Sequence, residues 1–323
     1  MTEFFLPTLS CPFPSRLNKY TEQLEAYSIS WLEQFNILKD ESDYQRFSNV
    51  KFFMLAGSAY PDCQFEELKI ANDWLIWLFI WDEQCDLSDL GKQPKMLENY
   101  HQRFLEVLTG TKPTNKDLAI THALYDIRKR MIEIDRTKKS FNYFVQKVKD
   151  YFQACVQESI NRVENSVPSV EAYMKLRRLN GAVDACLELV IFCNHLSIPD
   201  FVRKHEIVEK IALSTNNVIA WDNDIISSYR EITSGDIHNL IFIFKYHKHI
   251  SISEAIRLAI IMRTQELEKI IALEQASPSF GEEIDAELAK YISGFKSCIR
   301  GNIDWIALTK RYISLEMMLK IAA

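Results

Sequence analysis

The scarcity of residues that break helices is the feature of this sequence that most limits its fold. Only 8 glycines and 9 prolines punctuate 323 residues. Glycine and proline mark turns, so a chain with so few of them has few turns and long elements. A sheet protein would need a turn roughly every ten residues. The sequence therefore predicts a protein built from long helices.

Helical patterns cover most of the chain, and short breaks with turn residues separate them, such as "YPDC" at 60–63 and "TSGD" at 233–236. None of the breaks is long enough to be a domain linker, and no repeat of fixed period is present. We expect an irregular arm at residues 1–16 and a single all-α domain at residues 17–323. The expected helices cover residues 17–38, 43–58, 65–87, 93–108, 115–134, 138–164, 169–196, 201–231, 238–248, 252–275 and 280–319.

Composition argues against several functions and locations. The net charge is −6 and no block of Lys and Arg is present, so nucleic acid is not an expected partner. Seven scattered cysteines without a CxxC pair indicate reduced thiols in a cytoplasmic protein. The N-terminus lacks the basic and apolar regions of a signal peptide, and no apolar run reaches the roughly 18 residues of a membrane span.

Two segments, residues 74–81 and 183–193, are apolar on nearly every side. A helix that is hydrophobic all round lies inside a bundle. A large bundle of this kind can enclose an apolar cavity, and bundle cores are a usual place for metal and ligand sites. We therefore expect a central active-site cavity.

Acidic residues end the first apolar segment. Asp82 and Asp86 stand at i and i+4, so both carboxylates lie on one face at the C-terminal end of the expected helix. Like charges repel there, and the helix dipole disfavours them further. A bound Mg²⁺ would remove both penalties. A helix end with solvated acids is the alternative, and it is the better interpretation of this motif alone.

A second polar cluster lies on the helix expected at 201–231. Asn223, Ser227 and Glu231 form one stripe of oxygen ligands that could hold Mg²⁺. Arg230 could reach a phosphate, and Asp224 neighbours the stripe. The alternative is a polar stripe hydrogen-bonded within the bundle.

These two clusters resemble the metal motifs of microbial class I terpene synthases, and the resemblance covers nearly the whole chain. Residues 82–86, "DEQCD", are similar to the DDxxD motif of the family, with Glu83 in the second place. Residues 223–231, "NDIISSYRE", are similar to its NDxxSxx(K/R)E triad. The resemblance implies typically three Mg²⁺ ions, with Mn²⁺ as a substitute. The implied metal ligands are Asp82, Asp86, Asn223, Ser227 and Glu231.

Further features match the family in order and spacing. Arg177 lies 46 residues before Asn223, where the family has its diphosphate-sensing arginine. Asn180 and Gly181 fall at the linker and effector positions of the helix break that follows. The family linker is often Asp or Ser, so Asn180 is a departure. The alternative sensor is the neighbouring arginine, but Arg177 has the family's spacing to Gly181.

The C-terminal pair Arg311 and Tyr312 matches the pair that binds diphosphate when the family's active site closes. The segment "SGDIHNL" at 234–240 also resembles the family. Glu83 points about 100° away from Asp82 on a helix, so it either supports the metal site from outside or is solvated.

The resemblance implies that the enzyme ionises an allylic isoprenyl diphosphate and cyclises the resulting cation. Farnesyl diphosphate is the commonest substrate among similar chains of this size, so a sesquiterpene is the expected product. The expected diphosphate-binding residues are Arg177, Asn180, Arg230, Arg311 and Tyr312, and the expected aromatic wall contains Phe79, Phe53 and Trp305. Phe79 is favoured because it lies one turn below Asp82. For each aromatic residue singly, core packing is the alternative.

Other activities fit the sequence less well. A diterpene cyclase acting on geranylgeranyl diphosphate is the nearest alternative, since chain length depends on pocket depth. A chain-elongating prenyltransferase would want a second DDxxD motif, and a protonation-initiated cyclase would need DxDD. A non-catalytic binding protein would not need two intact metal motifs. No motif distinguishes a monomer from a homodimer.

Overall fold

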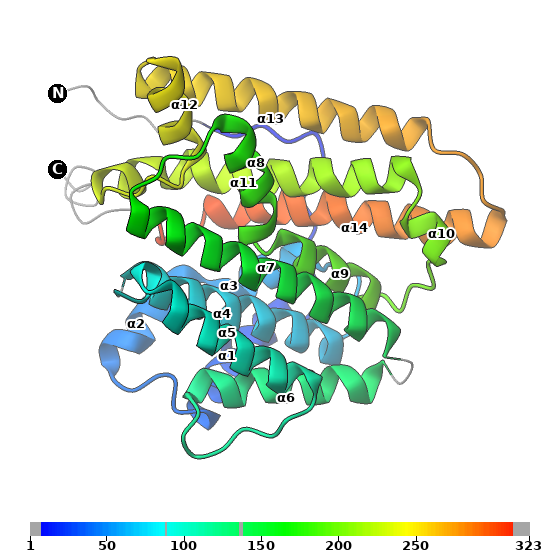
Figure 1. The fold of residues 1–323 in the computed structure, drawn as a ribbon. Helices are drawn as coiled ribbons and strands as arrows, with labels where there is room; N and C mark the ends of the chain where they lie inside the picture. Colours follow the sequence, from blue (N-terminus) through cyan, green and yellow to red (C-terminus); the bar gives the residue numbers. More distant parts are fainter. Residues whose placement is uncertain (1–7, 88, 136–137, 313–323) are drawn as a thin grey trace.

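The computed structural model describes residues 8–87, 89–135 and 138–312, which form helices joined by turns and loops, with no strand among them (Figure 1). The expected all-α fold is confirmed. The helices are α1 (Thr21–Gln34), α2 (Glu41–Val50), α3 (Phe52–Ala59), α4 (Phe65–Leu87), the 3₁₀ helix η1 (Asp89–Lys92), α5 (Pro94–Thr109), α6 (Ala119–Ile134), α7 (Lys139–Glu164), α8 (Val170–Asn180), α9 (Val183–Cys193), α10 (Asp200–Arg203), α11 (Glu206–Thr233), α12 (Leu240–Lys248), α13 (Ile252–Gln275) and α14 (Glu282–Ile306).

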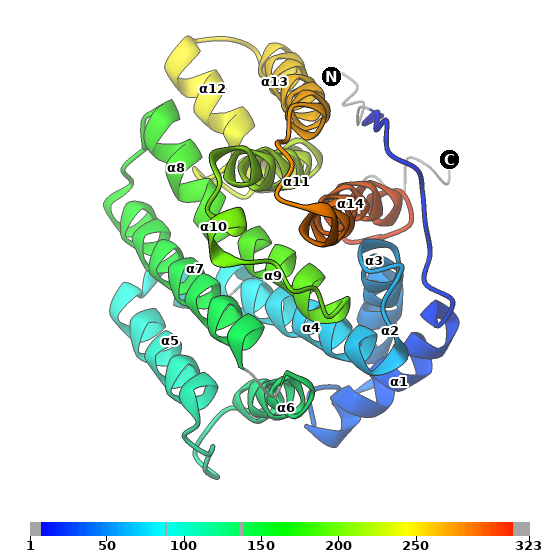
Figure 2. The same cartoon turned by 90° about the vertical axis from the view of Figure 1, so that its right-hand side faces the viewer.

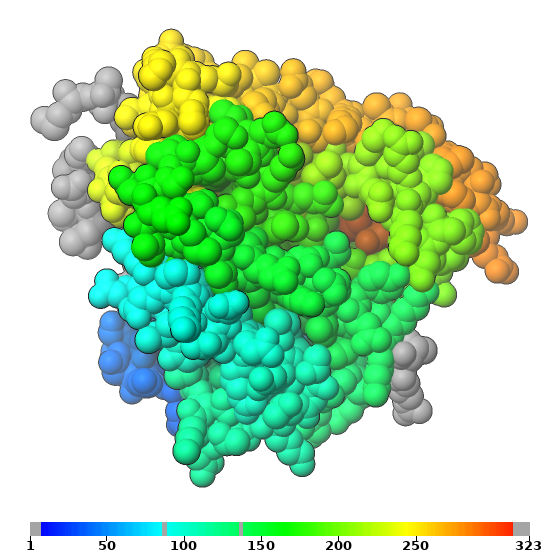
Figure 3. All heavy atoms as spheres, in the orientation of Figure 1, coloured from blue at the N-terminus to red at the C-terminus, as the bar shows by residue number. Residues whose placement is uncertain are grey.

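The two apolar segments form the centre of the bundle, as predicted. Figure 2 shows α4 and α9 surrounded by the other helices, and the two pack against each other. Trp74, Trp77 and Trp81 on α4 are at most 1% exposed. In the space-filling view of Figure 3, α5, α7 and α8 form an outer layer on one face. No helix in the described part of the chain combines the length and apolar character that crossing a membrane requires.

The N-terminal arm extends further than predicted, since α1 begins only at Thr21. Its described part passes along the outside of α14 (Figure 2) and buries Leu9 and Phe13. The Arg263 side chain on α13 donates a hydrogen bond to the Ser10 carbonyl, at 2.7 Å. The arm is therefore attached by both apolar and polar contacts.

Several predicted helices are interrupted. The helix expected at 43–58 is split at Lys51, which has a left-handed backbone with φ of 56°. Carbonyls at the end of α2 leave the helical pattern because they bond elsewhere: the Val50 carbonyl accepts from the Trp305 indole at 2.7 Å, and the Asn49 carbonyl accepts from the Lys310 amide at 3.0 Å. Tertiary partners thus satisfy groups that a continuous helix would have satisfied internally.

The segments expected to be helical at 169–196, 201–231 and 280–319 also contain breaks. The first breaks at Gly181 and Ala182, the second is divided into α10 and α11, and the third ends at Ile306. Residues 313–319 of the last prediction lie outside the described residues. Because α14 ends early, the chain turns back and carries Arg311 and Tyr312 toward the C-terminal part of α4.

Candidate active site

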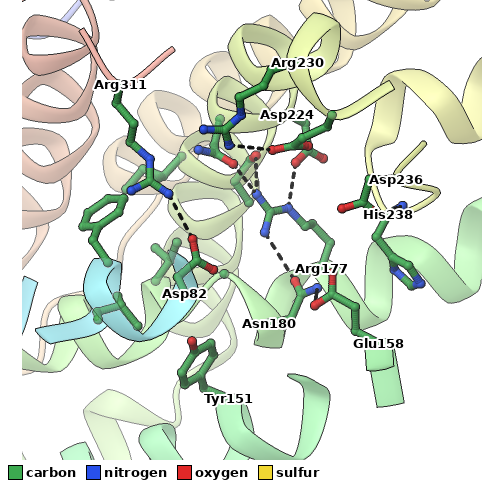
Figure 4. Close-up of a pocket in the computed structure, with 18 of the residues that line it drawn as sticks. Asp82, Tyr151, Glu158, Arg177, Asn180, Asp224, Arg230, Asp236, His238 and Arg311 are labelled. Atoms are coloured by element: carbon green, nitrogen blue, oxygen red, sulfur yellow. Dashed lines mark hydrogen bonds and ion pairs between the residues drawn. The ribbon is translucent and has the colours of Figure 1, made fainter. Parts of the chain in front are cut away.

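One pocket gathers most of the predicted site residues (Figure 4). Its lining comes from α4, α7, α8, α9, α11, α14, the loop after α11 and the turn after α14. The predicted residues that line it are Phe79, Asp82, Arg177, Asn180, Gly181, Asn223, Arg230, Glu231, Arg311 and Tyr312. Ser227, Phe53 and Trp305 do not line it. The side chain of Asp86 lies outside the described part of the structure.

The acidic end of α4 faces the C-terminal arginine. The Arg311 guanidinium lies 3.1 Å from the Asp82 carboxylate and 2.9 Å from the Glu83 carboxylate. It also lies 4.5 Å from the centre of the Phe79 ring, a favourable cation–π distance. Glu83 therefore binds the same arginine as Asp82. Asp82 and Glu83, the first two acids after the aromatic run, are thus both paired with Arg311.

The polar stripe on α11 lies on one face of the helix, as predicted. The side-chain oxygen Oδ1 of Asn223 accepts a hydrogen bond from Arg177 at 2.8 Å. The Asn239 amide donates to Glu231 at 2.9 Å and reaches the fully buried Ser227 hydroxyl at 3.5 Å. Burial raises the pKa of Glu231.

Each member of this stripe thus presents an oxygen atom to a hydrogen-bond donor. Hard oxygen atoms that attract donors in this way also suit a hard divalent cation, so the donor set fits a magnesium site. Among the described side chains, no group of three or more His, Cys, Asp or Glu residues is placed to hold a metal ion. A metal site here would therefore depend on the amide and hydroxyl oxygens of the stripe.

Arg177 is held from several sides. Its Nε donates to Asp224 at 2.8 Å, and its Nη2 donates to Asn223. The Tyr173 hydroxyl donates to the second oxygen of Asp224 at 2.6 Å. Burial, the largest single influence, would lower the pKa of Arg177, but Asp224 and the other acidic groups nearby together outweigh it, and the pKa is raised. The guanidinium is therefore a fixed positive charge on the pocket surface.

A break between α8 and α9 lies directly after this arginine. Gly181 has a helical φ of −78°, and the left-handed residue is Ala182, with φ of 53°. A Cβ atom on Gly181 would lie 3.5 Å from Arg177 Nη1 and 3.4 Å from the Arg177 carbonyl oxygen. Both distances are ordinary van der Waals contacts, so neither the backbone nor the surrounding space requires a glycine at position 181, and the turn itself is made at Ala182.

The apolar part of the pocket surface is formed by Leu78, Phe79, Val183, Ile219 and Ala220. Trp305 lies behind it, with its ring 5.4 Å from that of Phe79 and its indole bound to a backbone carbonyl of α2. Phe53 on α3 is half-buried and packs against the core. The structure thus places Phe79 on the pocket surface and the other two predicted aromatic residues away from it.

Sequence reasoning missed a group of polar residues in the same pocket. Glu158 and Arg162 stand at i and i+4 on α7, a spacing that could have drawn attention to them. Asp236 and His238 belong to the segment at 234–240. The missed lining residues are Tyr151, Glu158, Arg162, Asp236, His238 and Asn302.

Comparisons with known proteins agree with this geometry. A family profile described as terpene synthase family 2, C-terminal metal binding, matches residues 73–269. The chain is 50% identical over 318 residues to germacrene A synthase of Nostoc punctiforme, covering 98% of each chain. It is 31% identical to a (+)-T-muurolol synthase of Roseiflexus castenholzii, covering 100% of this chain and 99% of the relative.

Solved structures share the fold. Germacradien-4-ol synthase of Streptomyces citricolor matches with a TM-score of 0.82 at 21% identity, covering 94% of this chain and 99% of that one. An α-eudesmol synthase matches with a TM-score of 0.83 at 16% identity, covering 93% and 98%. With the family profile and the two curated relatives, the pocket between α4 and α11 assigns this chain to the metal-binding terpene synthases of family 2.

Proposed function

We propose that this terpene synthase is a magnesium-dependent cyclase that converts farnesyl diphosphate into a sesquiterpene hydrocarbon and releases diphosphate. One observation carries the proposal: Asp82 on α4 and Asn223 and Glu231 on α11 line the same pocket as Arg177, above an apolar surface. That arrangement suits a molecule with a diphosphate at one end and a hydrocarbon chain at the other.

The metal ions would be held by Asp82 and Asp86 on α4 and by Asn223, Ser227 and Glu231 on α11. Three Mg²⁺ ions are the expected number. Bound there, they would neutralise charge on the leaving diphosphate, so that its bond to carbon breaks without a proton donor.

The basic residues would bind the remaining diphosphate oxygens. Arg177 is already held in place by Asp224, so its side chain loses little further conformational entropy when the substrate binds. Arg230 lines the pocket beside Glu231. Arg311 and Tyr312 reach the pocket from the turn after α14, and Arg311 would exchange its present carboxylate partners for diphosphate. Contacts from Arg311 and Tyr312 to the diphosphate would also help to exclude water from the pocket.

The apolar surface would fold the hydrocarbon. Loss of diphosphate leaves an allylic cation, and attack by the distal double bond on C1 forms a ten-membered ring and moves the charge along the chain. Loss of one proton then gives a neutral C15 hydrocarbon. The name of the relative from Nostoc supports a germacrene-type product of this 1,10 closure. The Phe79 ring could stabilise the charge by cation–π attraction.

All seven cysteines are free thiols, which supports the proposal that the enzyme works in the cytoplasm. The function is tested by incubating purified protein with Mg²⁺ and separate C10, C15 and C20 prenyl diphosphates, followed by mass spectrometry of the organic extract. The expected result is a cyclic C15H24 hydrocarbon from farnesyl diphosphate. A dominant C20 product would instead support the diterpene alternative, and no terpene from any of them would refute the cyclase.

A further inference from the structure

A chain of polar contacts through α7 connects the end of α8, the helix that carries Arg177, to the loop after α11. Its members Asn180, Glu158 and Asp236 are labelled in Figure 4. The Asn180 amide at the end of α8 donates to the Glu158 carboxylate at 3.0 Å. The other Glu158 oxygen pairs with Arg162 at 3.0 Å, one turn further along α7. Arg162 in turn pairs with Asp236 at 2.9 Å. The four side chains form a continuous relay beside Arg177.

The relay reaches both parts of the proposed diphosphate site. At one end, the Arg177 guanidinium donates to the side-chain oxygen Oδ1 of Asn180 at 3.4 Å. At the other end, the Asp236 backbone amide donates to the Glu231 carbonyl at 2.9 Å. The sensor and the C-terminal end of the metal stripe are thus connected through α7, a helix to which neither belongs.

The relay is sheltered but lies in the pocket wall. Its Glu158, Arg162 and Asp236 side chains are 14 to 17% exposed, and all three line the same pocket as Arg177. Ion pairs with this degree of shelter are screened less than surface pairs and hold their partners in one geometry.

Asn180 is the member of the relay whose chemistry its two partners constrain most. An arginine side chain offers only donors and an ionised carboxylate offers only acceptors. An amide between them can accept from Arg177 and donate to Glu158 at once, whereas an aspartate could accept from Arg177 but would face Glu158 with a second negative charge. The asparagine at this linker position, where aspartate or serine is common in similar sequences, therefore matches the carboxylate on α7.

We propose that Glu158 and Arg162 are positioning residues for ionisation of the diphosphate, and that Asn180 must be an amide because Glu158 faces it. The relay keeps the Arg177 guanidinium and the end of the metal stripe at the spacing that the diphosphate requires. This inference rests on the proposed function. The residues act through Arg177 and Glu231.

A double-mutant cycle with Asn180→Asp and Glu158→Gln tests the proposal. Asn180→Asp should lower kcat for farnesyl diphosphate about 10- to 100-fold, the range expected for a lost hydrogen bond to a charged group. Glu158→Gln alone should lower kcat about tenfold. In the double variant the glutamine amide donates to the new carboxylate, so kcat should recover at least about fivefold over Asn180→Asp. The KM should stay within about threefold throughout.

The matched control is Gln157→Glu, which adds the same negative charge at an exposed neighbouring position on α7. It should leave kcat unchanged. An Asn180→Asp variant with kcat within twofold of wild type, or a double variant no better than Asn180→Asp, would overturn the relay. If Asn180→Asp does not fold, the single variant Glu158→Gln tests the proposal. A kcat of Glu158→Gln equal to that of wild type would then refute it. An inactive wild-type enzyme would instead refute the cyclase.

Discussion

Two buried aspartates on α11 stand two residues apart but have different roles, one in holding the fold together and one at the pocket. Asp222 and Asp224 are 0% and 1% exposed, and each pairs with one arginine. Asp222 binds Arg263 on α13, whereas Asp224 binds Arg177 on α8. Burial raises the pKa of both carboxyl groups, and the arginine opposes it in each case.

The difference lies in what each arginine touches next. Arg263 donates to the carbonyl of Ser10, so this pair ties α11 to α13 and to the N-terminal arm. Arg177 donates to Asn223 and lines the pocket. A buried aspartate–arginine pair is therefore not by itself a sign of function. Its position relative to the pocket decides, and mutations should separate the two roles.

The largest expected effect comes from the proposed metal stripe, Asn223, Ser227 and Glu231, on the same helix. Glu231→Ala or Asn223→Ala should lower turnover of farnesyl diphosphate at least about 10³-fold, near 4 kcal/mol of transition-state stabilisation, because a ligand oxygen is lost. The melting temperature should change little. Product formation by gas chromatography and unfolding by circular dichroism give both values. Activity above a tenth of wild type in both variants would refute these ligands.

Asp222→Ala should act on stability. It leaves the Arg263 charge buried without its carboxylate, and such losses cost about 3 to 5 kcal/mol of unfolding free energy. Urea denaturation measures the loss. The kcat of the protein that remains folded at low temperature should stay within about threefold of wild type. If Asp222→Ala were as stable as wild type but had lost turnover, the structural role assigned to the Asp222–Arg263 pair would be wrong.

Arg177→Lys should act on catalysis. A lysine keeps the charge but cannot contact Asp224 and Asn223 together with the planar geometry of a guanidinium. We expect kcat to fall about 100-fold, near 2.7 kcal/mol, with a smaller loss of stability than in Asp222→Ala. Steady-state kinetics and urea denaturation of the same preparation provide the comparison, and a kcat near wild type would argue against the sensor role.

The smallest effect concerns the apolar surface. Phe79→Leu removes the ring and should lower kcat about tenfold, since a cation–π contact contributes about 0.5 to 2 kcal/mol and the smaller side chain also changes the surface. Phe79→Tyr keeps the ring and should stay within about threefold of wild type. Equal kcat values for the two variants would exclude an aromatic role for this residue.

Helix α4 and the stripe on α11 could be predicted because their signals are local. An apolar run followed by acids gave α4 its observed bounds, and an i, i+4, i+8 spacing placed Asn223, Ser227 and Glu231 on one face. The residues that matched the family carried the diphosphate-binding prediction. Such features depend on periodicity and spacing, which sequence shows directly.

The relay and the helix breaks depend on contacts between distant segments. Lys51 and Ala182 adopt left-handed backbones without being glycine, because neighbouring helices and not local propensity fix them there. The i, i+4 spacing of Glu158 and Arg162 is also typical of an exposed ion pair on a helix surface, so it does not by itself indicate a site. Only packing reveals that Asn180 and Asp236 meet them. Asp224 belongs to the matched motif and Asp222 does not, but only packing shows which arginine each aspartate binds.

Diphosphate binding tests the central claim most directly, since it does not depend on product chemistry. Titration calorimetry of inorganic diphosphate should show binding to the wild-type protein in the presence of Mg²⁺ and at least about 100-fold weaker binding without it. Glu231→Ala should bind weakly in both conditions, while Gln157→Glu should behave like wild type. Equally tight diphosphate binding with and without Mg²⁺, or unchanged binding by Glu231→Ala, would contradict the metal site.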